Sequence, residues 1–480
     1  MVSVSGGEFK VIASKKEVVA AALPLQEHWL PLSNLDLLLP PMDVGVFFCY
    51  KKPTASGSFG FMVGVLKKAL AQALVSFYAF AGELVPNSVS EPELLCNNRG
   101  VDFIEAFADV DLQQLNLYNP DESIQAKLVP NKKHGVLAVQ ATELKCGGVV
   151  VACSFDHRIA DAYSANMFLV SWAHMAAHDQ YSKPLTLHPS FRRSLLNPRR
   201  PGSVDPSIDD MYMPVTALPP PAPTEDHLIS RIYYVEAGEL QHLQKLASSN
   251  GCKRTKLESF SALLWKLVAK CGTRGTSTNE HNSKSLCCKM GIVVDGRKRL
   301  SDQEDMGIDN KGLKAAADVN LMESYFGNVL SIPFGSKMVD ELVENPLDWV
   351  AGEVHDFIQG AVTKEHFLGL IDWVEAHRPV PGLAKIYGSG SEDGPAFVVS
   401  SGQRFPVSKV DFGWGRPFFG SYHFPWGGDA GYVMPMPTAT GNGDWVVYMH
   451  LSKRQLEFIE KEAAQVFRPL TFHYLDSLSV

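Results

Sequence analysis

A proline-rich run near the middle of the chain divides the sequence into two halves. Eight prolines fall between residues 197 and 228. Proline removes a backbone donor and fixes φ, so we expect no regular helix and no central strand here. Such a run is typical of a semi-rigid crossover between domains, and its length favours this over the alternative, a surface loop within one domain. The prolines are Pro198, Pro201, Pro206, Pro214, Pro219, Pro220, Pro221 and Pro223.

The length of the chain agrees with this division. Domains usually contain about 100–200 residues, so a chain of 480 residues is expected to form two large domains or three smaller ones. We predict an N-terminal domain over residues 1–197, a crossover over 198–228 and a C-terminal domain over 229–480. Short β-rich runs alternate with helices in both domains, which indicates an α/β or α+β architecture in each.

Hydrophobic periodicity indicates where the main elements lie. The apolar run at 147–155 predicts a buried strand. The helix expected after it, at 160–178, carries Phe168, Trp172 and Met175 at helical spacing. Further strands are expected at 228–237, 288–297 and 444–452, helices at 255–271 and 453–467, and irregular polar stretches at 272–285 and 301–312.

Composition excludes several classes of protein. Hydrophobic residues make up 45% of the chain and charged residues 20%, which is ordinary for a globular protein with a large core. The net charge is −8 with no long basic run, so we expect no nucleic-acid partner. The N-terminus lacks the pattern of a secretory signal, and no stretch approaches the roughly 20 apolar residues that span a bilayer. We therefore expect a cytosolic protein with no membrane partner.

The eight cysteines give no sign of a metal site. They form no CxxC pair and fit no zinc-ligand spacing, so no metal is expected. Reduced and mostly buried thiols are the simplest interpretation. The chain also shows no coiled-coil seam, and we expect a monomer.

His157 and Asp161 form the candidate catalytic pair, within FDHRIADAYSANMF. His157 stands where a buried strand is expected to end and a helix to begin, and ligand crevices of α/β proteins form at such edges. A neutral histidine, with a pKa near ~6.5, can accept the proton of a hydroxyl group. Asp161 can fix the loop or cap the helix. A core histidine followed by an ordinary helix cap explains the two residues equally well.

Three other segments have unusual composition. The glycines of DFGWG (411–415) flank a tryptophan and predict a tight turn. The segment GIVVDGRKRL (291–300) is a strand followed by basic residues, either a solvated cluster or the source of an ion pair with a buried acid such as Asp161. The other segments of note are YFGN (325–328) and LSNLDLLLPPMD (32–43).

HRIAD and DFGWG, in this order and about 250 residues apart, resemble the plant BAHD acyltransferase family. YFGN, DGRKR and the N-terminal LSNLDLLLPPMD match other recurrent stretches of that family, and the similarity runs from Lys15 to about Leu475. The resemblance implies two chloramphenicol-acetyltransferase-like domains, each a mixed sheet flanked by helices. A long crossover loop would join them, and a solvent channel would pass between them.

The resemblance also implies acyl-CoA-dependent transfer to a hydroxyl group, without a bound cofactor or a covalent acyl-enzyme. His157 would deprotonate the acceptor, and the alkoxide would attack the thioester of the acyl-CoA cosubstrate. Asp161 would orient the loop through Arg297 or Arg299. The motif residues Asp411, Phe412, Gly413, Trp414 and Gly415 would be structural and far from His157. From their charge and position, Lys253 and Arg254 are candidates for contacts with CoA.

Within the family the sequence most resembles the coniferyl alcohol acyltransferase branch. This implies a phenylpropanoid alcohol acceptor such as coniferyl alcohol, and we favour acetyl-CoA as the donor. Ala162 departs from the pattern, because the family usually has glycine there. A positive φ at this alanine would be strained.

The nearest alternative is a hydroxycinnamoyl-CoA transferase acting on shikimate, quinate or another acceptor. That branch typically has a His-Thr pair where this chain has Asp43 and Val44, and a Thr and a Trp where it has Ser400 and Gly402. Asp43, Ser400 and Gly402 are therefore candidates for the acceptor pocket. A negative Asp43 would repel an acidic acceptor, which favours a neutral alcohol.

Two functions of other classes remain. A cysteine such as Cys153 could act as the nucleophile of a ping-pong transferase, but Cys153 shares a strand face with Phe155 and is expected to face the core. The protein could also be a non-catalytic binding member of the fold. The retention of His157, Asp161 and DFGWG argues against that.

Overall fold

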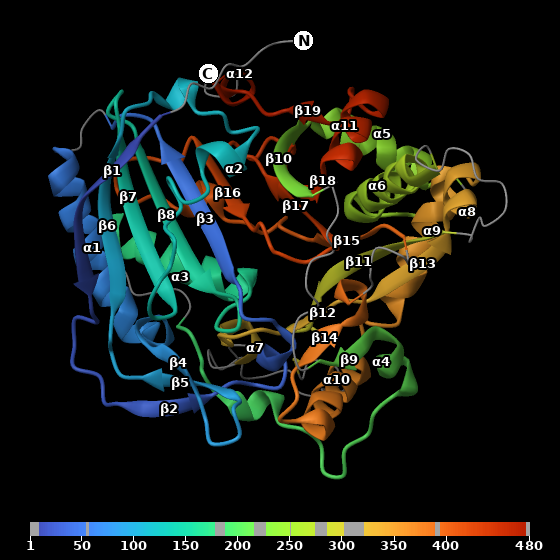
Figure 1. Ribbon diagram of the computed structural model, residues 1–480, viewed down its shortest axis with the longest axis horizontal. Coiled ribbons are helices and arrows are strands. Elements are labelled where there is room, and N and C mark those ends of the chain that lie inside the picture. The colour runs from blue at the N-terminus through green and yellow to red at the C-terminus, as the bar shows by residue number, and fades with distance from the viewer. Residues whose placement is uncertain are drawn as a thin grey trace, which may run out of the picture.

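The structure is a computed structural model of the chain. It describes residues 9–53, 57–177, 188–215, 227–249, 251–273, 286–301, 321–388 and 394–476. Two large sheets form its centre, and they face each other across the middle of the molecule (Figure 1).

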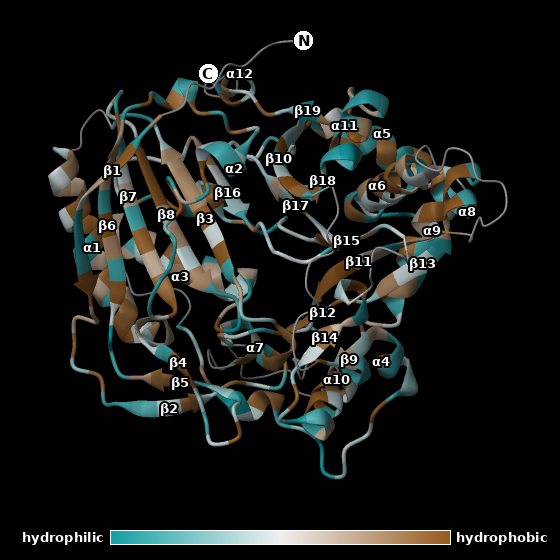
Figure 2. Ribbon diagram, viewed as in Figure 1, coloured by the Kyte–Doolittle hydropathy of each residue, from teal (hydrophilic) through white to brown (hydrophobic). Residues whose placement is uncertain are grey.

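The first sheet has six strands in the order β1-β6-β7-β8-β3-β16. It is mixed, because β6 and β7 are parallel and the other neighbours antiparallel. The apolar strand β8 is buried along its whole length, as such a run predicts, and Figure 2 shows it largely brown. The strands are β1 (Val11–Val19), β3 (Asp43–Tyr50), β6 (Val101–Ala108), β7 (Leu137–Leu144), β8 (Val149–Asp156) and β16 (Phe419–His423).

The strand β16 reaches the first sheet from the C-terminal half of the chain. Its residues 419–423 pair with residues 45–49 of β3, so the edge of β3 is covered. A division of the chain at residue 229 therefore separates β16 from the sheet to which it belongs.

The second sheet has eight strands. Seven follow the order β12-β11-β15-β17-β18-β10-β19, and β13 pairs with β11. The neighbours β11, β15 and β17 are parallel, and the other pairs are antiparallel. The strands are β10 (Leu228–Val235), β11 (Cys287–Asp295), β12 (Leu330–Ser331), β13 (Phe334–Met338), β15 (Ala396–Ser400), β17 (Gly431–Pro437), β18 (Trp445–Ser452) and β19 (Arg468–Pro469).

Helices cover both sheets. On the first sheet, α1 (Phe59–Ser76) and α3 (Ala162–Ala177) pack against each other. On the second, α6 (Lys256–Thr273) packs between its neighbours, on the side away from the first sheet (Figure 1). These neighbours are α5 (Ala237–Ala247), α8 (Val339–Glu344), α9 (Leu347–Gln359) and α11 (Lys453–Glu462).

Smaller elements complete the described part of the fold. A three-stranded sheet has the order β2-β5-β4, and β9 pairs with β14. These strands are β2 (His28–Pro31), β4 (Glu83–Pro86), β5 (Pro92–Cys96), β9 (Tyr212–Pro214) and β14 (Gly382–Ala384), and the remaining helices are α2 (Pro120–Ser123), α4 (Pro206–Met211), α7 (Leu321–Ser324), α10 (Lys364–His377) and α12 (Phe472–Asp476).

The proline-rich run is more regular than expected. The short helix α4 forms where the prolines predicted none, because Pro206 occupies a first helical position that needs no N–H donor. Asp205 caps this helix by accepting a hydrogen bond from the Ser207 N–H at 2.9 Å. Residues 216–226 of the run lie outside the described residues.

The predicted fold class, a mixed α/β architecture of sheets flanked by helices, is confirmed. The strand and helix expected around His157 are present as β8 and α3, and Phe168 and Trp172 of α3 are buried. The other predicted strands correspond to β10, β11 and β18 and the other helices to α6 and α11, although α11 ends five residues before the predicted position. The polar stretches 272–285 and 301–312 lie mostly outside the described residues.

One helix in the described part of the chain, α1, is long and apolar enough to cross a membrane by length and composition, which the sequence analysis did not expect. In the structure it packs as a core helix. Leu66 and Leu70 are buried, and the Leu66 carbonyl accepts a hydrogen bond from Trp172 Nε1 at 3.0 Å. Lys67 of the same helix forms ion pairs with Glu17 and Glu105.

Candidate active site

A cavity of about 690 Å³ lies between the two sheets. Side chains from β3, β8 and β16 line it on one side and side chains from β11, β15 and β17 on the other, so both halves of the chain build it. A large cavity with apolar walls and a few polar groups is the usual form of a ligand site. Its apolar wall includes Leu38, Met42, Val44, Phe155, Ile332, Phe405, Phe424, Trp426 and Met434.

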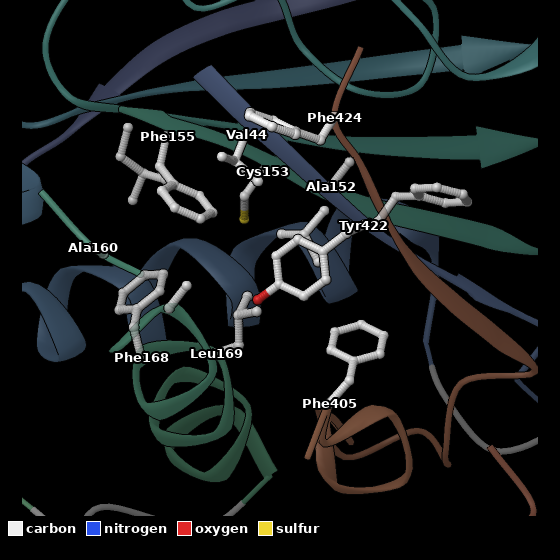
Figure 3. Close-up of a cluster of buried hydrophobic side chains, with 14 of the residues drawn as sticks. Val44, Ala152, Cys153, Phe155, Ala160, Phe168, Leu169, Phe405, Tyr422 and Phe424 are labelled. Atoms are coloured by element: carbon white, nitrogen blue, oxygen red, sulfur yellow. The ribbon is translucent and has the colours of Figure 1, made fainter. Parts of the chain in front are cut away.

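Aromatic side chains gather on the first-sheet side of this cavity. Figure 3 shows Phe424 extending toward Val44 of β3, and Tyr422 of β16 extending toward Leu169 of α3. The Tyr422 hydroxyl reaches the helix α3, where it donates to Asn166 Oδ1 at 2.9 Å. Because β16 carries Tyr422, its place in the first sheet puts C-terminal side chains on this wall.

His157 is the first residue after β8, and its side chain lines the cavity. Its backbone N–H donates to the Met42 carbonyl at 2.9 Å, and its ring makes an edge contact with Phe424 at 5.9 Å between centroids. Burial lowers the pKa of the imidazole, because the charged form loses its solvation. The neutral, proton-accepting form is therefore favoured near neutral pH.

Asp161 is fully buried and forms an ion pair with Arg297. Arg297 Nη1 lies 2.7 Å from Asp161 Oδ2, and Nη2 lies 3.1 Å from Oδ1. The N–H groups of Ser164 and Val329 also donate to this carboxylate, at 2.9 and 3.2 Å. Of the two arginines that the sequence suggested, Arg297 makes the pair, while Arg299 is exposed at the cavity wall.

Ala162 is the first residue of α3. Within the described part of the chain, the non-glycine residues with positive φ are Ser90, Asn98 and Ala126, and Ala162 is not among them. The strain expected at Ala162 therefore does not arise, because the backbone enters the helix there without a left-handed residue.

The DFGWG segment forms the predicted tight turn. Asp411 Oδ1 accepts hydrogen bonds from the N–H groups of Gly413 at 2.8 Å and Gly415 at 3.0 Å. Both glycines have positive φ, at 100° and 108°, which a side chain would strain. Phe412 packs edge-on against Trp172 of α3 at 4.8 Å between centroids, and Trp414 contacts Tyr50 of β3. Residues 411–415 do not line the cavity.

The acceptor-pocket candidates divide into two groups. Ser400 and Gly402 line the cavity, but a Cβ at Gly402 would lie 2.7 Å from Met436 Cγ, so no larger side chain fits there. Asp43 does not line it, although its neighbours Met42 and Val44 do. Successive side chains point to opposite faces of a strand, and Asp43 instead pairs with Lys132 at 3.1 Å. The expectation that Asp43 repels an acidic acceptor inside the pocket is therefore wrong.

The CoA candidates Lys253 and Arg254 precede α6 and do not line the cavity. Lys253 is exposed, and Arg254 is half-buried beneath Gln244, whose amide donates to the Arg254 carbonyl at 2.7 Å. Sequence reasoning missed three other cations. Lys298, Arg404 and Lys409 line the cavity beside Arg299, and all of them are exposed.

Asn328 and Asp36 are further residues that sequence reasoning did not connect to the site. Asn328 Nδ2 donates to the His157 carbonyl at 3.0 Å and to Asp36 Oδ1 at 2.9 Å. Asn328 belongs to the YFGN segment and Asp36 to the LSNLD segment. Membership of these two motifs was therefore the sequence signal that could have identified them as site residues. Their contact joins positions 292 residues apart, which a single sequence does not reveal.

Cys153 lies in the core, as expected from its position on β8. It is 2% exposed, and burial raises the pKa of its thiol far above its ordinary value. Figure 3 shows its sulfur among apolar side chains. A thiol in this environment is held in the protonated form, which is a poor nucleophile.

Comparison with known proteins agrees with this geometry. A family model described as "Transferase family" matches residues 9–466. A shikimate O-hydroxycinnamoyltransferase from Nicotiana tabacum is 26% identical over 458 residues, which cover 92% of this chain and 96% of the relative. A (Z)-3-hexen-1-ol acetyltransferase from Arabidopsis thaliana is 27% identical over 478 residues, which cover 94% of each chain. The names of these relatives differ in both acyl group and acceptor.

Two solved structures share the fold. Vinorine synthase superposes with a TM-score of 0.69 at 18% identity, covering 96% of this chain and 99% of the other. F. graminearum TRI101, complexed with coenzyme A and deoxynivalenol, superposes with a TM-score of 0.71 at 12% identity, covering 92% and 99%. Taken with the family match over nearly the whole length, these findings show that the chain belongs to the Transferase family of BAHD acyltransferases and is an acyl-CoA-dependent acyltransferase.

Proposed function

We propose that the protein transfers an acyl group, with acetyl the favoured one, from acyl-CoA to a neutral phenylpropanoid alcohol such as coniferyl alcohol, with His157 as the general base. The observation that carries this proposal is the position of His157. It places a desolvated imidazole, with a lowered pKa, on the wall of a cavity that both halves of the chain build.

The mechanism follows from the state of this imidazole. Nδ1 of His157 is buried, which leaves Nε2 to face the acceptor. Nε2 takes the hydroxyl proton while the oxygen attacks the thioester carbonyl, and a tetrahedral oxyanion forms. The C–S bond then breaks, and the imidazolium returns its proton to the sulfur of CoA. General-base catalysis of this kind contributes about 10²–10⁴-fold to a rate.

A neutral acceptor is favoured by the distribution of charge around the cavity. The lysines and arginines on its wall, among the described residues, are all exposed. An anionic acceptor with its hydroxyl at His157 would have to bury a carboxylate against aromatic rings, and burying an unpaired charge is costly. Tyr422, Phe424 and Trp426 offer an aromatic ring good contacts instead.

The runner-up is a hydroxycinnamoyl-CoA transferase with an acidic acceptor such as shikimate. The relative from Nicotiana tabacum carries that name. The observation in its favour is the group of exposed cations on the cavity wall, which includes Arg299 and Arg404. A carboxylate that stays near solvent could pair with these arginines.

A product assay by mass spectrometry tests the proposal. The purified protein receives coniferyl alcohol or shikimate together with acetyl-CoA or p-coumaroyl-CoA. We expect coniferyl acetate from the parent, and a loss of at least about 100-fold in kcat for His157→Ala. His134→Ala is the matched control, since His134 is exposed and outside the cavity lining. Coumaroyl shikimate as the main product would overturn the acceptor, and full turnover by His157→Ala would overturn the role of the base.

A further inference from the structure

A second buried carboxylate lies beside the catalytic loop. Asp36 is fully buried, as is its neighbour Asn328. The Ser33 N–H and hydroxyl donate to Asp36 Oδ2 at 2.8 and 2.7 Å, and the Asn328 N–H donates to Oδ1 at 2.7 Å. Four hydrogen bonds, counting the one from Asn328 Nδ2, therefore hold a carboxylate that the mechanism above does not use.

The side-chain amide of Asn328 connects this carboxylate to His157. Its Nδ2 has two hydrogens, and they are directed to Asp36 Oδ1 and to the His157 carbonyl. Both partners are acceptors only, so the amide must present its NH₂ group to them. Its Oδ1 is buried without a partner. The orientation of Asn328 is thus determined by Asp36, at the cost of one unsatisfied oxygen.

The same short segment also contacts the other buried carboxylate. Val329, next to Asn328, donates its N–H to Asp161 Oδ2. The loop from His157 to Asp161 is therefore held at its end by Asp161 and Arg297, and at its start by Asn328 and Asp36. Neither Asp36 nor Asn328 lines the cavity, so neither touches the substrate.

We propose that Asn328, oriented by Asp36, is a positioning residue that holds the backbone carbonyl of His157 and so sets where the imidazole meets the acceptor hydroxyl. This inference rests on the proposed role of His157 as the base. Proton transfer depends steeply on geometry, and a misplacement of about 1 Å can cost about 100-fold in rate. A residue that acts in this way affects kcat more than the binding of either substrate.

The chain contains a matched control in Asn34. Its Nδ2 also donates to a backbone carbonyl and a carboxylate, Ile371 O at 2.9 Å and Glu375 Oε2 at 3.1 Å. It is buried like Asn328 but does not line the cavity and makes no contact with His157 in the described part of the chain. Asn34→Ala therefore removes two hydrogen bonds of the same kind without touching His157, together with one that Asn34 Oδ1 accepts from Arg378 Nη1 at 3.2 Å.

The experiment compares Asn328→Ala and Asn34→Ala in the full-length enzyme, with kcat expressed per folded molecule. We expect kcat of Asn328→Ala to fall by about 10- to 100-fold with both KM values changed by less than about 3-fold, and kcat of Asn34→Ala to stay within about 2-fold of the parent. Equal effects of the two variants, or a rise in KM alone, would overturn the proposal.

Asn328→Asp keeps the shape of the side chain and supplies a second readout. A carboxylate there would face Asp36 and the His157 carbonyl, and both would repel it. On protonation it could again donate a hydrogen bond to one of them. We therefore expect its kcat to recover partly as the pH falls from about 8 to about 6, a trend opposite to general-base catalysis by the parent. A pH profile parallel to that of the parent would count against Asn328.

Imidazole NMR of histidine-labelled enzyme gives a readout that needs no substrate, with the His157 signal assigned by its loss in His157→Ala. We expect its titration to change in Asn328→Ala and not in Asn34→Ala, and an unchanged titration in both would overturn the positioning role. His157→Ala in the activity assay separates the two proposals. If that variant stays active, the base assignment fails. If it is inactive while Asn328→Ala matches Asn34→Ala, only the positioning role fails.

Discussion

A buried carboxylate and a buried guanidinium lie side by side behind the catalytic loop. Removing Asp161 and Arg297 from water is expensive, and only close hydrogen bonds offset that cost. The structure supplies two between the charged groups, and the N–H groups of Ser164 and Val329 add two more. Because Arg297 follows β11 of the second sheet, the pair also ties the loop to the other half of the molecule.

Arg297→Ala is expected to lower the free energy of unfolding by about 3–5 kcal/mol, because it leaves Asp161 buried without its partner. Denaturant unfolding followed by fluorescence measures the change. Arg299→Ala removes an exposed arginine two residues further along the chain and should change the free energy of unfolding by no more than about 0.5 kcal/mol. Similar losses in the two variants would show that the buried pair contributes little.

The pH dependence of the reaction should report the desolvation of His157. Its pKa is lowered from the ordinary value of 6.5, and only the neutral imidazole accepts a proton. We therefore expect kcat/KM to be constant at neutral pH and to fall as the pH drops through a value below 6.5. Steady-state kinetics, with circular dichroism to confirm folding at each pH, measures this. An acid limb centred above 6.5 would contradict the proposed environment.

At the scale of secondary-structure elements, the sequence predicted the strand and the helix on either side of His157, which are β8 and α3, but it predicted no strand at β3. It named Asp43 as a candidate for the acceptor pocket, whereas the neighbouring residues Met42 and Val44 line the cavity. An error of one residue reverses the face of a strand. His157 and Asp161 lie close together in sequence and were predictable for that reason, whereas the contact of Asn328 with Asp36 depends on the tertiary fold.

The loop that carries DFGWG gives a prediction at this scale. Asp411→Ala removes the acceptor of two backbone hydrogen bonds, and each such bond is worth about 0.5–1.5 kcal/mol. We expect the free energy of unfolding to fall by about 1–3 kcal/mol, with kcat and KM per folded molecule unchanged because the loop does not line the cavity. Thermal unfolding together with steady-state kinetics tests both parts. A selective loss of kcat would place the loop in the chemistry.

At the scale of the whole molecule, the two halves of the chain depend on each other. The first sheet obtains its edge strand β16 from the C-terminal half, and both sheets line one cavity. Without β16, the backbone groups of β3 would form an exposed edge, which promotes aggregation. The crossover thus connects two units of which the second supplies a strand to the first, so the first sheet is not complete within the N-terminal segment.

A split at residue 227 tests this dependence. The fragment 1–227 alone should be insoluble or lack a cooperative unfolding transition, because β3 then has no β16. The control is the same fragment produced together with residues 228–480, where we expect a soluble complex that elutes at the size of the intact chain. Size-exclusion chromatography and circular dichroism distinguish the outcomes. A stable, cooperatively folded 1–227 fragment would show that β16 is dispensable for the first sheet.

The late position of β16 in the sequence has a consequence for how the protein is made. β16 begins about 370 residues after β3 ends, and at synthesis rates of about 5–20 residues per second the ribosome needs roughly 20 to 75 seconds to cover that distance. Throughout that interval the nascent chain carries a β3 edge whose own partner does not yet exist. Lower growth temperatures and an ample supply of chaperones should therefore raise the yield of folded enzyme more than substitutions of its catalytic residues do.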